Sequence, residues 1–282
     1  MISKKRIKHA AGTSARVLAL TVYLLAAILP LFWILITSIK NGEELYALPL
    51  VYWPKQPTLD AYKRLFSYSN FGQYFLNSLL VTLSSSLVAM VLALIGGFSL
   101  SRFHRKKVKA VVEIILYFTQ TVPSFMIMLP LFMLFSKWHM VDQLPALAVI
   151  YVAIVIAFCT LMSRSFFDRI PVSLEEAAKM DGCSMMQSMV YIVIPLTLPG
   201  IAAIFCFAFV NIWNELFIAV MMINKAAKYT VPVALNSFIS KAGVSWDLMS
   251  AGIVVSLLPT MIVFAFGQKY IVAGLTDGGV KG

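Results

Sequence analysis

Residues Ile170 to Ile201 read IPVSLEEAAKMDGCSMMQSMVYIVIPLTLPGI, and they form the longest charged, proline-bounded interruption in the otherwise apolar second half of the chain. Ser173 and Glu176 have the spacing of a capping box, in which hydroxyl and carboxylate satisfy each other's backbone N–H groups. This pattern predicts a helix of about two turns from Leu174 to Asp181. Gly182 adopts positive φ at little cost, so we expect it to end that helix.

The stretch continues with a second cap and a second helix. Ser184 and Gln187 repeat the capping-box spacing, and the helix they open is expected to end at Pro195, whose ring clashes with the carbonyl four residues earlier. A helix of two turns is not stable alone in water. We therefore expect the face that carries the small side chains of Ala177 and Ala178 to pack into a groove of another protein.

The composition is that of a membrane protein. Hydrophobic residues make up 60% of the 282 residues and charged ones 12%, against about 25% charged in soluble domains. A helix needs about 20 apolar residues to cross the hydrocarbon core. Runs of that length predict an all-α integral membrane protein with six transmembrane helices. These are Arg16–Ile39, Tyr74–Leu100, Val111–Phe135, Leu144–Phe166, Ile201–Met222 and Met249–Ile271.

Lys and Arg are distributed unevenly between the two sides of the predicted membrane. Of the 23, 15 lie in the N-terminal tail, the 101–110 loop, the central stretch and the C-terminal end. By the positive-inside rule, both termini and the central stretch are expected to be cytoplasmic. Contact with anionic membrane lipid explains the net charge of +11, so no nucleic-acid partner is inferred.

These features divide the chain into parts. We expect a cytoplasmic N-terminal tail (1–15), the first transmembrane helix with an extracytoplasmic loop (16–71), a five-helix core (72–272) with the central loop at 167–200, and a cytoplasmic C-terminal tail (273–282). The first span exceeds the apolar run of about 7–15 residues found in signal peptides, so we interpret it as an uncleaved anchor. Residues 58–66 are expected to form a short helix at the outer interface.

Polar side chains inside the predicted spans are candidates for a translocation path. An ionisable group at this depth costs about 2.5–3.5 kcal/mol on insertion scales, so Glu215 must serve either as a cap or interhelical hydrogen-bond partner, or as part of a pore or gate. The third predicted span contains Pro123 and Pro130, which predict a bent helix that lines a cavity. The candidate path residues are Asn77, Gln120, Asn211, Asn214 and Glu215.

The sequence holds no pattern typical of an enzyme. There is no G-x-x-x-x-G-K-[ST] motif, so this chain does not bind nucleotide through a P-loop, and no catalytic constellation lies in the spans. The three histidines are scattered, and the three cysteines are interpreted as small apolar side chains, so no metal site is expected. Any ATP must therefore be bound by another chain.

The central stretch closely resembles the EAA loop of binding-protein-dependent ABC importer permeases. The resemblance rests on Glu176-Ala177-Ala178, Asp181-Gly182, Ile194-Pro195 and Pro199-Gly200. It extends over essentially the whole chain, and Asn77-Ser78, Trp213 to Phe217 and Gln268 to Gly282 are similar to the maltose-type, MalG-like carbohydrate permeases. Cys183 departs from the pattern, because the family usually has alanine there.

This resemblance implies a multi-pass subunit of a carbohydrate importer in the prokaryotic inner membrane. The implied partners are a second permease subunit in a heterodimer, two copies of an ABC ATPase and an extracytoplasmic sugar-binding protein. The ATPase would bind ATP and Mg²⁺, and this chain would bind no cofactor. The implied ATPase-coupling residues are Glu176, Ala177, Ala178, Asp181 and Gly182, and the implied tail residues at the ATPase interface are Thr276, Gly278, Gly279 and Lys281.

Other functions remain open at this point. A permease of the same architecture for glycerol phosphate or an amino acid fits the same motifs, although the absence of Lys and Arg deep in the spans favours a neutral, hydroxyl-rich solute. A stand-alone secondary transporter or channel would transport without ATP and would be expected to show inverted repeats or interrupted helices around an ion site. A membrane enzyme would need a catalytic set.

Overall fold

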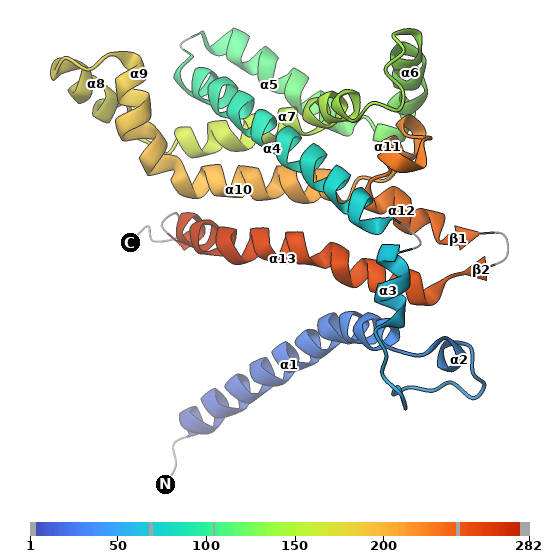
Figure 1. Cartoon of the computed structure of the whole chain (residues 1–282). Coiled ribbons are helices and arrows are strands. Elements are labelled where there is room, and N and C mark those ends of the chain that lie inside the picture. Colours follow the sequence, from blue (N-terminus) through green and yellow to red (C-terminus); the bar gives the residue numbers. More distant parts are fainter. Residues whose placement is uncertain (1–3, 68–69, 104, 241–242, 277–282) are drawn as a thin grey trace. The chain divides into compact units, whose positions relative to one another are not determined.

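The structure is a computed structural model, and it describes residues 4–67, 70–103, 105–240 and 243–276 (Figure 1). The chain divides into two compact units. Unit 1 comprises Met1–Phe71 and Ser237–Val255, and unit 2 comprises Gly72–Asn236 and Ser256–Gly282. Helix α13, Trp246–Thr276, starts in unit 1 and ends in unit 2.

Unit 1 contains the first long helix and the segments around it. Its elements are α1 (Lys4–Ser38), α2 (Gly42–Leu45), α3 (Asp60–Ser67), the antiparallel strands β1 (Ile239–Ser240) and β2 (Gly243–Val244), and the first turns of α13. The predicted short helix at 58–66 is confirmed as α3. An ion pair between Arg64 and Asp247 joins α3 to the start of α13, and the Tyr46 hydroxyl donates to the carbonyl of Val244 at 3.0 Å.

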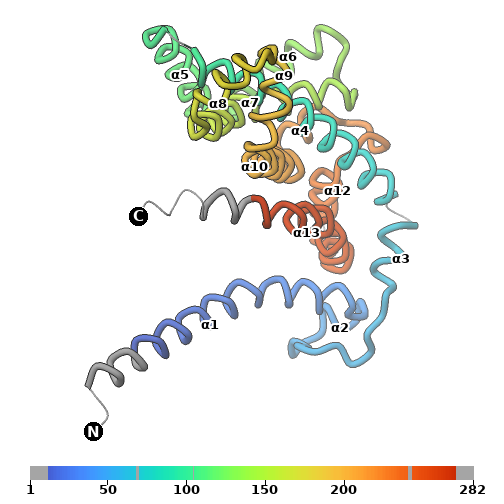
Figure 2. The backbone as a smooth tube through the Cα atoms, turned by 90° about the vertical axis from the view of Figure 1, so that its left-hand side faces the viewer, coloured from blue at the N-terminus to red at the C-terminus, as the bar shows by residue number. Residues whose placement is uncertain are grey.

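Unit 2 contains most of the membrane helices. Helices α7 and α10 pack against each other, with α8 and α9 at one end of α10 and α11 at the other (Figure 1). Figure 2 shows α7, α8, α9 and α10 from the side. The elements are α4 (Phe71–Arg102), α5 (Lys106–Thr121), α6 (Ser124–Lys137), α7 (Leu144–Phe167), α8 (Val172–Met180), α9 (Met185–Ser188), the π-helical turn η1 (Met189–Val193), α10 (Ile194–Trp213), α11 (Phe217–Met222), the 3-10 turn η2 (Ala226–Lys228) and α12 (Val231–Ser237).

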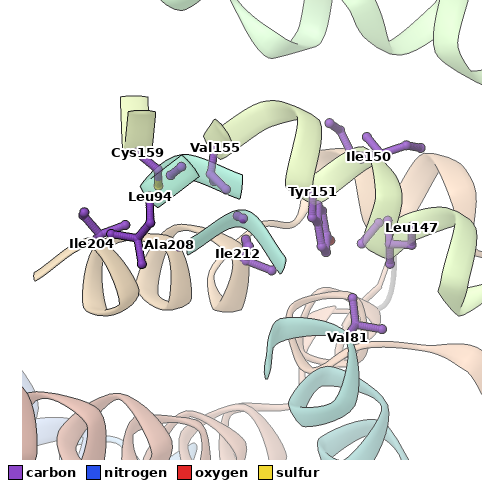
Figure 3. Packing of buried hydrophobic residues seen from close by; sticks show 14 of the residues in the cluster. Val81, Leu94, Leu147, Ile150, Tyr151, Val155, Cys159, Ile204, Ala208 and Ile212 are labelled. Carbon is purple, nitrogen blue, oxygen red and sulfur yellow. The ribbon is translucent and has the colours of Figure 1, made fainter. Parts of the chain in front are cut away.

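The core of unit 2 forms where α4, α7 and α10 meet. Figure 3 shows Leu94 of α4, Cys159 of α7 and Ala208 of α10 in this buried cluster. Close contact depends on small residues, because a Cβ on Gly97 would lie 2.7 Å from the backbone nitrogen of Arg164. A Cβ on Gly200 would overlap the Phe166 ring. Helix packing through small residues is typical of membrane bundles.

The expected number of spans agrees with the helices. Among the described residues, five helices are long and apolar enough to cross a membrane, and the pair α5 and α6 makes a sixth if it counts as one span. That pair bends by 93° at Val122 and Pro123. The bend predicted for the third span is therefore confirmed, because Pro123 cannot continue α5 and instead precedes the first turn of α6.

The predicted bounds of the fifth span are wrong at both ends. The helical segment begins at Met185 and ends at Trp213, whereas Ile201–Met222 was expected, and Pro195 does not end a helix. Pro195 lies in the first turn of α10, directly after η1, where its missing N–H is compatible with the i to i+5 bonding of a π turn. Beyond Trp213 the chain breaks before the separate helix α11.

At the two short helices of the central stretch, one helix end differs from expectation and two agree. The capping box predicted for Ser173 and Glu176 is wrong, because α8 starts earlier, at Val172, directly after the fixed φ of Pro171, and has no side-chain cap. Gly182 has φ +85°, as expected for a residue that ends a helix, and the capping box of Ser184 and Gln187 is confirmed at α9. At the C-terminal end, α13 continues beyond the predicted Ile271 to Thr276.

Candidate coupling loop and membrane cavity

The coupling loop, residues 167–200, presents two short helices that meet at Gly182. Ala178 is buried against the rest of this chain, whereas Glu176, Ala177 and Asp181 are exposed. The backbone N–H of Asp181 donates to the carbonyl of Ala177 at 3.0 Å, so Asp181 closes the last turn of α8. Of the two alanines expected to face a partner, only Ala177 is free to do so within this chain.

Large apolar side chains surround these helices and have no cover from their own chain. Met180 is 88% exposed, Tyr191 75%, Met185 72% and Met186 69%. Methionine is flexible and polarisable, and exposed clusters of it are typical of surfaces that bind other proteins. The exposed surface of α8 and α9 therefore has the chemistry of a protein-binding site, and it extends beyond the residues that the sequence motif indicates.

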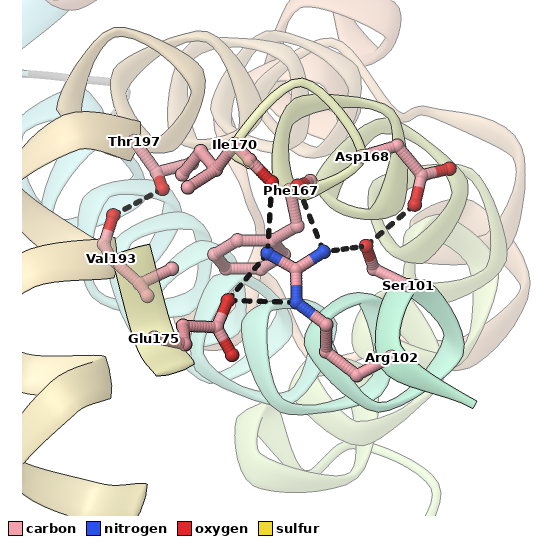
Figure 4. Close-up of polar contacts among 8 residues, drawn as sticks. All are labelled: Ser101, Arg102, Phe167, Asp168, Ile170, Glu175, Val193 and Thr197. Atoms are coloured by element: carbon pink, nitrogen blue, oxygen red, sulfur yellow. Dashed lines mark hydrogen bonds and ion pairs between the residues drawn. The ribbon is translucent and has the colours of Figure 1, made fainter. Parts of the chain in front are cut away.

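An ion pair fixes α8 to the end of α4. Nε and Nη2 of Arg102 donate to Oε1 of Glu175 at 2.8 and 2.5 Å (Figure 4). Both side chains are largely buried, with 13% and 17% exposed. Sequence reasoning missed this pair, because Arg102 belongs to a run of basic residues and Glu175 lies beside the family motif. The bond places Glu175 against its own chain and leaves Glu176 facing outward.

A cavity of about 760 Å³ lies among α5, α6, α7 and α10. A volume of this size suits a small ligand, and the lining combines aromatic walls with a few polar groups. Gln120, Asn211 and Glu215 line it, so three of the five predicted path residues come together, whereas Asn77 and Asn214 are not among the lining residues. Its other polar and aromatic lining residues are Thr119, Ser124, Phe135, Tyr151, Phe158 and Phe207.

Glu215 serves as a helix cap and also lines the cavity. Its carboxylate accepts from the backbone N–H groups of Ile218 and Ala219, the first turn of α11, at 3.0 and 3.2 Å. A carboxylate at this position complements the unpaired N–H groups and the positive end of a helix. The Tyr151 hydroxyl donates to the same carboxylate at 3.0 Å. Tyr151 was missed from sequence, although a tyrosine in an otherwise apolar span needs a partner for its hydroxyl.

The two remaining path candidates form hydrogen bonds to backbone. Asn77 is buried, and its amide nitrogen donates to the carbonyls of Ala227 and Tyr229, both at 3.0 Å. These bonds fix the turn that precedes α12. Asn214 is exposed and donates to the carbonyl of Val210 at 2.8 Å, at the end of α10.

The predicted tail lies largely beyond the described part of the chain. Thr276 is the last residue of α13, and Gly278, Gly279 and Lys281 lie outside the described residues.

Cys159 and Cys206 are buried, Cys183 is half-buried, and none of the three forms a disulfide. Within the described ranges, no three His, Cys, Asp or Glu side chains lie close enough together to hold a metal ion.

The helices, the exposed loop and the cavity define an integral membrane protein of the transporter class. The sequence profile of the family described as "binding-protein-dependent transport system inner membrane component" matches residues 89–277, and the chain belongs to this family. It is a permease component of an ABC importer in the inner membrane. The prediction from the EAA motif is thereby confirmed.

Relatives align over nearly the whole chain. The sulfoquinovosyl glycerol transport system permease protein SmoH of Agrobacterium fabrum is 32% identical over 271 residues, which cover 96% of this chain and 95% of that protein. The arabinooligosaccharides transport system permease protein AraQ of Bacillus subtilis is 29% identical and covers 98% of this chain and 100% of its own length. A crystal structure of a bacterial ABC transporter that imports the acidic polysaccharide alginate matches with TM-score 0.79 and 25% identity, over 96% of this chain and 99% of that one.

Proposed function

We propose that this chain is one of two permease subunits in an importer that moves a neutral saccharide into the cell at the expense of ATP. An extracytoplasmic binding protein delivers the sugar, and two copies of a separate ABC ATPase bind ATP and Mg²⁺. Relatives named for saccharide transport, one of them a structure for an acidic polysaccharide, support a saccharide as the solute, and the lining of the cavity supports a neutral one. The separation of two surfaces along α10 supports a permease that couples them. The exposed coupling loop precedes the start of that helix, and the cavity lies near its other end, where Phe207, Asn211 and Ile212 line it.

The coupling loop is the proposed docking site for the ATPase, on the cytoplasmic side with both termini. Glu176 and Ala177 are exposed on α8, and Asp181 and Gly182 form the bend, so a groove can receive them. Exposed Met180 and its neighbours add apolar contact area. Ala178 contributes differently, because it packs α8 onto its own chain. The tail from Thr276 to Lys281 is proposed to reach the interface between the two ATPase copies.

The cavity is the proposed part of the translocation path in this subunit. The amide nitrogens of Gln120 and Asn211 each donate to a backbone carbonyl of their own helix, at 3.2 and 2.8 Å, so their amide oxygens are the groups offered to sugar hydroxyls. Phe158 and Phe207 supply apolar walls. Among the lining residues that the structure describes, Glu215 is the one charged side chain, and no Lys or Arg is present. An anionic sugar lacks a counter-charge here and meets a carboxylate, so the lining favours a neutral saccharide.

The test uses the complete complex, purified from its native membrane through a tag on this chain and reconstituted in proteoliposomes with its binding protein. ATP hydrolysis and sugar uptake are measured with arabino-oligosaccharides, diacetylchitobiose and maltose as neutral probes, and with alginate oligosaccharides as the acidic probe. We expect at least one neutral saccharide to stimulate both rates. Uptake without ATP, or stimulation by methionine, glycerol phosphate or the acidic probe alone, overturns the proposal.

A further inference from the structure

Arg102, the last residue of α4, binds the coupling loop and the end of α7 at the same time. Nε and Nη2 hold Glu175 of α8, Nη2 also donates to the carbonyl of Ile170 at 3.2 Å, and Nη1 donates to the carbonyl of Phe167 at 3.3 Å. Figure 4 shows the guanidinium between these groups. The planar fork of arginine makes this possible, because its donors point in fixed directions that a lysine cannot reproduce.

The same cluster extends to α5. Nη1 of Arg102 donates to the Ser101 hydroxyl at 2.8 Å, and that hydroxyl donates to Oδ1 of Asp168 at 2.5 Å. Asp168 forms an ion pair with Arg164 at 3.1 Å, and Arg164 forms another with Glu113 of α5 at 2.8 Å. One connected network of polar side chains therefore joins α8 to α4, α7 and α5.

The burial of this network makes its bonds hard to break. Glu175 and Arg102 are mostly shielded from water, and separation of a shielded pair leaves an uncompensated charge. Of the two carbonyls that Arg102 binds, that of Phe167 belongs to the last residue of α7 and that of Ile170 to the turn that follows, so the positive charge also complements the dipole of α7. The contact is therefore expected to persist while the loop moves.

The chain itself attaches the loop at two points, through the turn at 168–171 to α7 and through η1 to α10. Two backbone attachments still allow α8 to swing about the line that joins them. Ala178, which is buried against its own chain, restricts this movement, and the attachment from α4 through Arg102 restricts it further. Gly200 of α10 packs against Phe166 of α7, and Gly97 of α4 packs against the backbone of Arg164 in α7. Helices α4, α7 and α10 therefore form one packed group.

We propose that Arg102 is a positioning residue that transmits movement of the coupling loop to the membrane helices by holding α8 on α4 and α7 through Glu175. This role rests on the proposed function of the chain as an ATP-driven permease. It assigns to Arg102 and Glu175 a task separate from that of Glu176, which faces outward. Loss of the link leaves the ATPase docked but lets α8 move without the helices.

The test compares Arg102→Met and Glu175→Gln with the wild-type complex in proteoliposomes. The readouts are ATPase co-purification, basal ATP hydrolysis, and saccharide imported per ATP hydrolysed. We expect co-purification to be retained, basal hydrolysis to stay within about twofold, and import per ATP to fall at least tenfold. Arg105→Met is the matched control, because Arg105 is an exposed arginine three residues further on, and it is expected to match the wild type.

Two further variants distinguish loss of the movement that Arg102 transmits from loss of correct folding. Arg102→Lys keeps the positive charge but loses the forked donors of the guanidinium. We expect normal assembly, with the saccharide imported per ATP hydrolysed lowered about threefold or more. The double variant Arg102→Met with Glu175→Gln is expected to lose no more than Arg102→Met alone, because Glu175 acts through Arg102. Unchanged import per ATP in Arg102→Lys, or additive losses in the double variant, overturns the inference. Failure of the wild-type complex to import saccharide instead overturns the proposed function.

Discussion

The hydroxyl of Tyr151 in α7 donates a hydrogen bond of 3.0 Å to Oε2 of Glu215, which follows α10 in the chain. The same carboxylate caps α11 through the N–H groups of Ile218 and Ala219. One side chain therefore joins α7, the end of α10 and the start of α11 at the edge of the cavity. Glu215 therefore belongs both to the lining of the cavity and to the cap of α11.

The first prediction concerns the charge of Glu215. Glu215→Gln keeps an oxygen acceptor and nearly the same shape, so we expect the complex to assemble, while saccharide uptake falls several-fold and its dependence on saccharide concentration changes. Glu215→Ala also removes the cap, a loss of about 1 kcal/mol, and is expected to lower the thermal melting temperature as well. Uptake assays and thermal melting of the purified complex measure the two effects.

Asp142 supplies a control, because it is a carboxylate that accepts from backbone N–H groups away from the cavity. Its Oδ1 accepts from the N–H groups of Asn224 and Lys225 at 2.6 and 2.9 Å, and it is not a lining residue of the cavity. Asp142→Ala is expected to lower the melting temperature without changing the concentration dependence of uptake. If Glu215→Gln has the uptake curve of the wild type, the carboxylate acts only in structure.

The second prediction concerns the contact of α4 with α7. A methyl group on Gly97 would lie within 2.7 Å of the Arg164 backbone, which cannot rotate away, so Gly97→Ala forces the helices apart at a cost of about 1–3 kcal/mol. Gly96→Ala is the matched control, because its methyl group would meet the Thr160 side chain at 3.2 Å. We expect Gly97→Ala to reduce the yield and melting temperature of the complex and Gly96→Ala to have a smaller effect. Equal melting of both variants contradicts this packing.

Much of the architecture could be predicted from composition and local chemistry. The apolar runs indicate the spans because hydrocarbon thickness sets their length, and Gly182 and Ser184 indicate helix ends because their chemistry acts within a few residues. The fifth span shows where such reasoning fails. Proline normally stops a helix, but the π turn before Pro195 lets the helix continue, and no local pattern shows that Glu215 starts a new one.

The candidate site was predictable only where the partners are close in sequence or belong to a family motif. Gln120, Asn211 and Glu215 were recognised individually as polar residues in apolar spans, and the cavity that unites them depends on how three separate segments pack. The ion pair of Arg102 and Glu175 bridges 73 positions of sequence. An arginine in a basic loop carries no local sign that its guanidinium is buried.

The third prediction concerns the bend between α8 and α9. Gly182 has φ +85°, a conformation that costs a residue with a branched Cβ about 1–2 kcal/mol, whereas asparagine adopts it more readily. Among the described residues other than Gly182 and its two chain neighbours, no atom lies within 4 Å of the position that a Cβ would occupy, so the cost comes from the backbone conformation. Gly182→Val is expected to weaken ATPase co-purification and saccharide-stimulated hydrolysis, and Gly182→Asn to retain most of both. Equal behaviour of the two variants shows that the bend does not require the left-handed backbone.

The fourth prediction concerns the outward face of α8. Glu176 is exposed, whereas its neighbour Glu175 is bound to Arg102, so charge reversal at 176 changes the docking surface without breaking a described bond within the chain. We expect Glu176→Lys to insert into the membrane at normal levels and to lose ATPase co-purification or, if the ATPase stays bound, saccharide-stimulated hydrolysis by at least tenfold. Glu43→Lys, an equal reversal at an exposed glutamate in α2, is the control and is expected to retain both. Wild-type ATPase binding and transport in Glu176→Lys is incompatible with docking through α8. Because Glu175→Gln is expected to keep the ATPase while uncoupling it, the two adjacent glutamates separate docking from transmission in one pair of measurements.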